Sequence, residues 1–136
     1  MTVGTLSDED RFEVVKYRLE KSQRAYHEAV GSIDSGFVET AANRLYYAVS
    51  ALLIAHGISA RTHNGVIQMF GLNFIKPKLI DRKYGAIFNQ LFSLRLTGDY
   101  EDRQNLDLQT DVIPLVDPAK ELIDKVSELA KQAVGL

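Results

Sequence analysis

The sequence predicts an all-α protein, a helical bundle of four long helices and one short helix that forms a single domain over residues 1–136. Apolar side chains recur every three or four residues along most of the chain, which is the period of an α-helix. No stretch alternates apolar and polar residues between turn signals, so we expect no sheet. A length of 136 residues suits one hydrophobic core, and 46% hydrophobic with 25% charged residues is a globular composition.

The first long helix is predicted from its cap and its apolar spacing. Ser7 followed by Asp10 indicates the helix start, and we expect the end near Gly31. The apolar positions are Phe12, Val15, Leu19, Tyr26 and Val30.

The second long helix is predicted to lie at the centre of the bundle. Asp34 or Ser35 is expected to cap it, and His56-Gly57 to end it. Two adjacent apolar stripes run along it, namely Phe37, Ala41, Leu45, Ala48 and Leu52 beside Ala42, Tyr46, Val49 and Leu53. Two such stripes imply burial over a wide arc.

A polar loop at residues 58–65 is predicted to precede the short helix, which contains Val66, Ile67 and Phe70 and which Pro77 ends. The third long helix is expected at residues 81–96, with Gly98 as its stop. Its apolar face is Tyr84, Ile87, Phe88, Leu91 and Leu94.

After a polar loop at residues 97–109, the last helix is predicted to start at Asp117-Pro118, a cap followed by a proline suited to a first helical turn. Its apolar positions are Leu122, Ile123, Val126, Leu129, Ala130 and Ala133.

Composition excludes several kinds of site. The chain has no cysteine, which rules out thiol catalysis, disulfides and cysteine-ligated zinc, and its three histidines lack metal-ligand spacing. We therefore expect no metal and no cofactor. The longest aliphatic run, residues 51–55, is too short for a bilayer span, and the acidic start of the chain is unlike a signal peptide. A cytoplasmic protein is the resulting expectation.

Charge is distributed unevenly around a net charge of −2. Residues 61–83 carry five basic side chains and one acid, whereas residues 99–124 carry eight acids and two bases. The basic segment could bind a phosphate backbone, or it could be a solvated face balanced by acidic neighbours in space.

Polar residues interrupt the apolar pattern of the second helix. Asn43, Tyr47 and Ser50 share one face by helical spacing, and Arg44 lies beside them. They could form a ligand-binding stripe, or the tyrosines could pack as core residues while the polar groups bond locally.

Arg95 continues the apolar stripe of the third long helix at its C-terminal end. Its guanidinium could hold a phosphate or stabilise charge in phosphodiester cleavage. Alternatively, the helix dipole favours a cation there, paired with Asp99 or Glu101. Asp99 could act as a general base, and His63 could carry protons near neutral pH, although both are also ordinary loop residues.

Several segments, taken in order, resemble the HEPN superfamily of small helical bundles over about residues 12–126. They are Ala-Ala-Asn-Arg-Leu-Tyr-Tyr-Ala-Val at 41–49, Ala-Leu-Leu at 51–53 with Gly57, His-Asn-Gly at 63–65, and Leu94-Arg95 with Asp99-Tyr100. The match is to the prokaryotic standalone branch. The resemblance implies an up-and-down bundle that forms a homodimer and is often encoded beside a small nucleotidyltransferase as a toxin–antitoxin pair.

Many members of that family are metal-independent endoribonucleases that use an Arg and a His a few residues later. Arg95 matches the Arg, but Asp99-Tyr100 stands where the His would fall. An ionised Asp repels a phosphate, so we expect a module that binds a nucleotide, RNA or a nucleotidyltransferase partner around Asn43, Arg44, Tyr47, His63 and Tyr100. The alternative is a metal-independent endoribonuclease toxin with Arg95 as the phosphate-stabilising residue.

Overall fold

The computed structural model describes residues 7–56, 63–100 and 107–135. The helices are α1 (Asp8–Asp34), α2 (Val38–Ala55), α3 (His63–Phe70), the π-helical turn η1 (Gly71–Ile75), α4 (Lys83–Tyr100), the π-helical turn η2 (Leu108–Val112) and α5 (Ile113–Val134). The described residues contain no strand. The predicted all-α class, with four long helices and one short helix, is confirmed.

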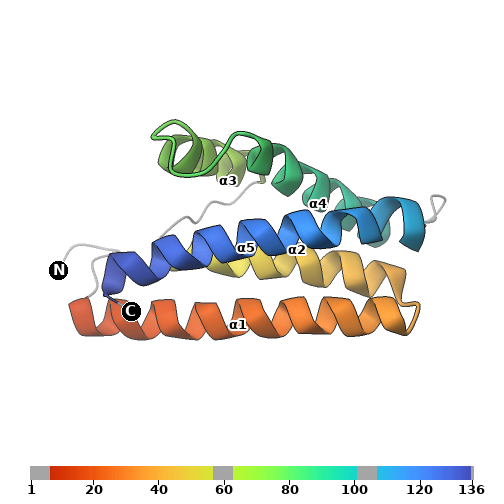
Figure 1. Ribbon diagram of the computed structural model, residues 1–136, viewed down its shortest axis with the longest axis horizontal. Coiled ribbons are helices and arrows are strands. Elements are labelled where there is room, and N and C mark those ends of the chain that lie inside the picture. The colour runs from red at the N-terminus through yellow and green to blue at the C-terminus, as the bar shows by residue number, and fades with distance from the viewer. Residues whose placement is uncertain (1–6, 57–62, 101–106, 136) are drawn as a thin grey trace.

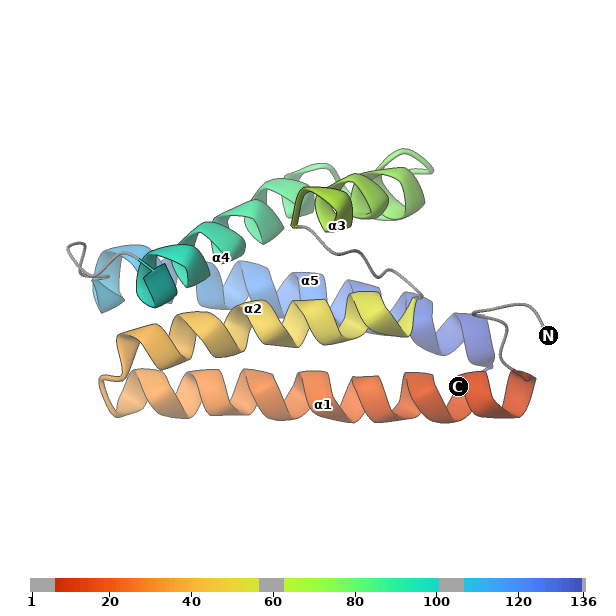
Figure 2. The ribbon, with the colours of Figure 1, turned by 180° about the vertical axis from the view of Figure 1, so that it is seen from behind.

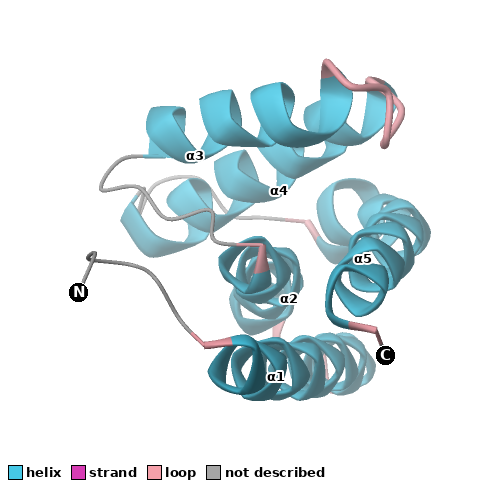
Figure 3. Ribbon diagram, turned by 90° about the vertical axis from the view of Figure 1, so that its left-hand side faces the viewer, coloured by secondary structure: helices cyan, strands magenta, loops and turns pink. Residues whose placement is uncertain are grey.

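The long helices run alternately up and down the bundle. Figures 1 and 2 show α1 and α4 running in one direction and α2 and α5 in the other. Figure 3, a view along the bundle, places α2 at the centre, with α1 below it, α5 beside it, and α3 with α4 above it. The C-terminal end of α4 lies at the same end of the bundle as the turn between α1 and α2.

The predicted central position of α2 is confirmed by burial of most of its surface. Its apolar stripes supply Ala41, Ala42, Leu45, Ala48, Val49, Leu52 and Leu53, each at most 1% exposed. Phe37 does not join them, because it lies in the turn before α2 with 63% of its surface exposed. No helix in the described parts of the chain is long and apolar enough to cross a membrane.

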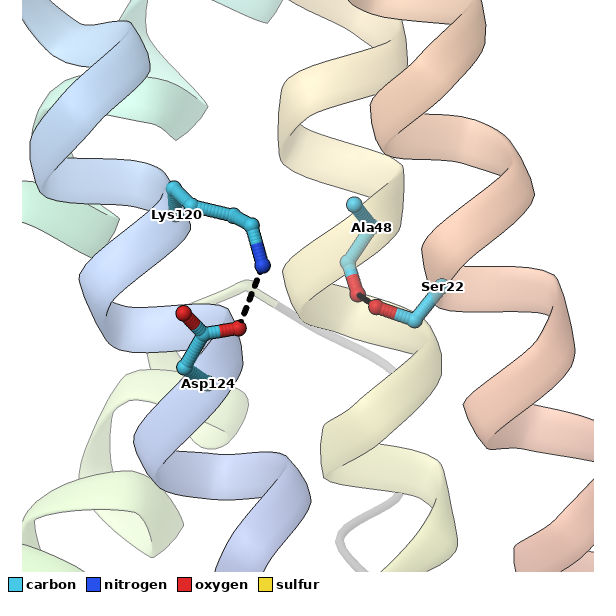
Figure 4. A network of polar contacts seen from close by, with 4 residues as sticks. All are labelled: Ser22, Ala48, Lys120 and Asp124. Carbon is cyan, nitrogen blue, oxygen red and sulfur yellow. Dashed lines mark hydrogen bonds and ion pairs between the residues drawn. The ribbon is translucent and has the colours of Figure 1, made fainter.

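Small side chains bring α1 and α2 close together. Ala25 and Ala29 of α1 are fully buried in the core that contains Ala41 and Leu45 of α2. The Ser22 hydroxyl of α1 donates a 2.6 Å hydrogen bond to the carbonyl of Ala48 in α2 (Figure 4). Bulky side chains at these positions would hold the two backbones too far apart for that bond.

The cap of α1 is confirmed, but its C-terminal end is later than predicted. The Ser7 hydroxyl accepts a 3.1 Å hydrogen bond from the Asp10 amide. The helix passes Gly31 and ends at Asp34, with Ser35 as its own C-cap, so neither of the last two caps α2. Gly36, at a φ of 78°, closes α1 with a left-handed turn.

A second left-handed turn closes α3 and η1. The helix starts at His63, inside the predicted loop, and Pro77 lies in the turn that ends it, as predicted. The Leu79 amide donates to the Phe74 carbonyl and the Lys78 amide to the Ile75 carbonyl, which is the paired bond pattern of a Schellman motif. Lys78 has a φ of 62° and is the one non-glycine residue with positive φ in the described ranges.

Two predicted boundaries around α4 and α5 are wrong. Gly98 does not stop α4, which continues to Tyr100. Asp117 does not cap α5, because the helical chain already begins at η2, where the Asp107 carboxylate accepts hydrogen bonds from two backbone amides. Packing of Val112 and Ala119, both fully buried, continues the helix across Pro118.

The two left-handed turns predict opposite effects on stability. Lys78→Gly should raise the free energy of unfolding by about 0.5–1 kcal/mol, because glycine adopts positive φ without the clash of a Cβ. Gly36→Ala should lower it by about 1 kcal/mol for the same reason, since no atom lies near a Cβ built there and only the backbone conformation is strained. Urea unfolding measures both. If both variants changed the free energy of unfolding in the same direction, the assignment of backbone strain to Lys78 but not to Gly36 would be wrong.

Candidate functional site

Three of the predicted ligand-binding residues lie together on α2. The Arg44 guanidinium donates a 3.1 Å hydrogen bond to the Asn43 side-chain oxygen and lies 5.0 Å from the centre of the Tyr47 ring. All three side chains are half-buried. The amide and the ring therefore orient the guanidinium, the first by a hydrogen bond and the second by a cation–π contact.

This arrangement suits an anionic ligand. A guanidinium carries five N–H donors in a planar fork, and the bond to Asn43 uses part of that set. The other donors can bind two oxygens of a phosphate or carboxylate at once. The Tyr47 ring beside them offers a surface on which a base can stack.

Ser50 and Tyr46 of α2 make their contacts within the protein. The Ser50 hydroxyl donates to the Tyr46 carbonyl one turn earlier, at 3.0 Å. The Tyr46 ring stacks in parallel on Phe88 of α4 at 5.6 Å and contacts Phe92 at 5.7 Å between ring centres. Tyr46 thus packs as a core residue, and of the predicted stripe only Asn43 and Tyr47 join Arg44.

Contacts of Tyr46 bring the end of α4 beside this cluster. Because α2 and α4 are antiparallel, residues one turn after Phe92 lie near residues one turn before Tyr46. Arg95 is three positions after Phe92, and Asn43 is three before Tyr46. The two predicted groups of site residues therefore occupy the same end of the bundle.

The side chains of the other predicted site residues lie outside the described residues. Arg95, Asp99 and Tyr100 belong to the last turns of α4, where Arg95 and Asp99 are one helical turn apart. His63 is the first residue of α3. Their roles, including pairing of Arg95 with Asp99, remain predictions.

A groove that the sequence did not indicate runs between α4, η2 and α5. Its volume is about 780 Å³, and it is lined by Ile87, Asn89, Gln90, Ser93, Leu94, Thr110, Asp111, Pro114, Leu115 and Pro118. Its charged lining residue is Asp111, so phosphate is a poor match. These residues come from separate segments of the chain, so no local sequence pattern predicts the groove. Within the sequence, only the adjacent amide side chains of Asn89 and Gln90 could have drawn attention to it.

Two titratable groups with shifted pKa serve the fold. His56 is half-buried, with its Nε2 3.1 Å from the Val126 carbonyl and its ring edge-on to Phe74. Burial lowers the pKa of His56, aided by the charge of Arg11 and opposed by the bond to Val126. Burial also raises the pKa of Tyr84, whose hydroxyl donates to the Glu121 carboxylate at 2.9 Å and so joins α4 to α5.

Comparison with known proteins identifies related chains. The HEPN domain family model matches residues 15–130. A "UPF0332 protein" of Thermotoga maritima is 27% identical over 124 residues, which are 88% of this chain and 93% of that protein.

Two relatives from Methanocaldococcus jannaschii carry the names "Putative toxin MJ0142" and "Putative toxin MJ0605". The first is 31% identical over 87 residues, 61% of this chain and 59% of the relative, so the match spans less than two thirds of that protein. The second is 30% identical over 93 residues, 65% of this chain and 68% of the relative.

Stability should fall in acid because of His56. The Val126 carbonyl only accepts, so Nε2 carries a proton and donates it. Because the pKa of the folded ring lies below the ordinary 6.5, the unfolded chain binds more protons than the folded one as the pH falls below that value. This contribution is complete above pH 6.5 and is lost as the pH falls through the lower pKa of the folded state.

Urea unfolding between about pH 7 and about pH 5 tests this, because that range spans histidine titration. His56→Gln keeps a donor for Val126 and should flatten the pH dependence. His27→Gln, on the exposed face of α1, is the matched control and should leave it unchanged. An unchanged slope in His56→Gln would count against the assignment.

Proposed function

Because this chain belongs to the HEPN domain family, we propose that it is a toxin-type HEPN module that binds RNA as a homodimer. The binding surface is the α2 cluster of Asn43, Arg44 and Tyr47 together with the Arg95 end of α4. A small nucleotidyltransferase is the partner that would control it, as the resemblance implies.

The observation that carries the proposal is the orientation of Arg44. A hydrogen bond from Arg44 to Asn43 and a contact with the Tyr47 ring fix a half-buried cation on the central helix. A side chain that served only solubility would need no such support. A prepositioned guanidinium beside an aromatic ring suits a phosphate and its adjoining base.

The names of the two Methanocaldococcus relatives favour the toxin class. They also support a second candidate function, that of a metal-independent endoribonuclease. In a metal-independent endoribonuclease, the ribose 2′-oxygen attacks the adjacent phosphorus, the bond to the 5′-oxygen breaks, and a cyclic phosphate and a 5′-hydroxyl form. Arg95 would stabilise the charge on phosphorus. Asp99 or His63 would take the 2′-hydroxyl proton, and the 5′-oxygen would regain a proton.

RNA retention separates binding from cleavage. Purified protein is incubated with a mixed RNA pool in chelator, and the products are read for cleavage and for gel retardation. Arg44→Ala should weaken retention roughly tenfold or more, because hydrogen bonds from a charged group contribute about 1.5–3 kcal/mol. Arg24→Ala, an exposed arginine of α1, is the matched control.

Each result has a definite meaning. Retention without cleavage, weakened in Arg44→Ala but not in Arg24→Ala, supports the binding module. Cleavage that is lost in Arg95→Ala, together with growth arrest when the wild type is expressed alone, supports the ribonuclease. If the wild type neither retains nor cleaves RNA, both functions are refuted, and the search turns to the nucleotidyltransferase partner.

The homodimer is tested separately. Light scattering should give a mass of about 30 kDa, twice the 15.2 kDa of one chain. A value of one chain mass at working concentration would remove the shared site from the proposal while leaving RNA binding by the monomer open to the retention assay.

A further inference from the structure

A second hollow lies beside the N-terminal half of α4, away from the Arg95 end. Its volume is about 330 Å³, and it is lined by Ile67, Phe70, Gly71, Ile75, Lys76, Arg82, Gly85, Ala86 and Asn89. About 20 Å of helix separates the positions of Arg82 and Arg95 at 1.5 Å per residue. The hollow is therefore distinct from the α2 cluster.

The rim of the hollow is basic. Lys76 and Arg82 line it, both exposed, and Lys78 and Lys83 stand near them in the chain. Asp81 is the one acid in this segment, and its carboxylate accepts a 2.9 Å hydrogen bond from the Lys83 amide. Among the described residues, no acid forms an ion pair with Lys76, Lys78 or Arg82. These cations are the described part of the basic segment at residues 61–83. The proposed RNA-binding surface on α2 does not include them.

The floor of the hollow is apolar and is formed by the half-buried Ile67 and Ile75 and the exposed Ala86. Phe70 is 1% exposed and packs at an angle against Phe88, which holds it in place. Gly85 also lines the hollow, where a Cβ would make ordinary van der Waals contacts at 4.0 Å with Phe70 and Ile75. Asn89 supplies an exposed amide that can hydrogen-bond to a base edge.

Backbone strain at Lys78 is an independent observation. Its left-handed conformation is costly for a lysine and free of that cost for glycine, yet the chain places a cation there. Residues with strained backbone cluster at ligand-binding and active sites. A lysine beside Lys76 and Arg82 extends the basic rim.

We propose that this hollow is a second RNA contact, in which a base of single-stranded RNA lies on the apolar floor and the flanking phosphates bind Lys76, Lys78 and Arg82. The proposal rests on RNA binding as the proposed function and extends it along α4. An acidic protein segment would match the cations but would leave the floor and the Asn89 amide unused.

Fluorescence anisotropy with a labelled 2′-O-methyl oligouridylate about ten nucleotides long tests the contact, since this probe cannot be cleaved at the 2′-oxygen. The double variant Lys76→Gln with Arg82→Gln should bind roughly tenfold more weakly at about 50 mM salt. Its log–log salt slope should be about 1.4 smaller, because each phosphate contact on a single strand contributes about 0.7.

The matched control is Lys16→Gln with Arg24→Gln, which removes one lysine and one arginine from the exposed face of α1. Its salt slope should stay close to that of the wild type. Lys78→Gly should bind more weakly while melting at a higher temperature, a combination that general loss of folding cannot produce.

Four outcomes overturn the proposal. The first two are a salt slope of the double variant equal to that of the wild type and undiminished RNA binding by Lys78→Gly. The other two are an affinity for an abasic strand of the same length equal to that for the oligouridylate, and competition by polyglutamate as strong as that by unlabelled oligouridylate. If Arg44→Ala weakens binding while the double variant does not, only the second contact fails. If the wild type binds no RNA, the proposed function fails with it.

Discussion

Helices α1 and α2 meet through small side chains, and this close approach sets the place of the other helices. Ala25 and Ala29 face the alanines of α2, and the Ser22 hydroxyl reaches the Ala48 carbonyl across the interface at 2.6 Å. With α1 so near, the other sides of α2 are left to the larger side chains of α4 and α5. The hydrophobic core therefore surrounds α2, instead of filling an interior space between four equivalent helices.

Burial of α2 also determines which of its polar residues meet solvent. The positions that pack against neighbouring helices are apolar, and Asn43, Arg44 and Tyr47 occupy the arc that remains half-exposed. Tyr46 turns the other way and stacks on Phe88, which fixes how α4 crosses α2. Apolar packing therefore positions both parts of the proposed RNA surface.

The two ends of α4 differ in the way their surroundings are built. Near its start, the turn that closes η1 concentrates cations around an apolar hollow, and a strained lysine belongs to that turn. Near its end, the helix continues through Gly98 alongside the start of α2. A strand bound along α4 would contact positive groups at both ends of the helix.

The sequence by itself determined the class of fold and the core of α2. Helical periodicity and the positions of small residues are local features, so they can be recognised without knowing which segments pack together. It also indicated Ser7 as a cap and Arg44 as part of a polar cluster. The start of α5 could not be predicted, since packing of Val112 and Ala119 outweighs the local preferences of Asp117 and Pro118. Only the tertiary structure decided that the Tyr46 ring stacks on Phe88 of α4 and that a groove and a hollow flank α4, because these facts depend on which residues from distant segments come into contact.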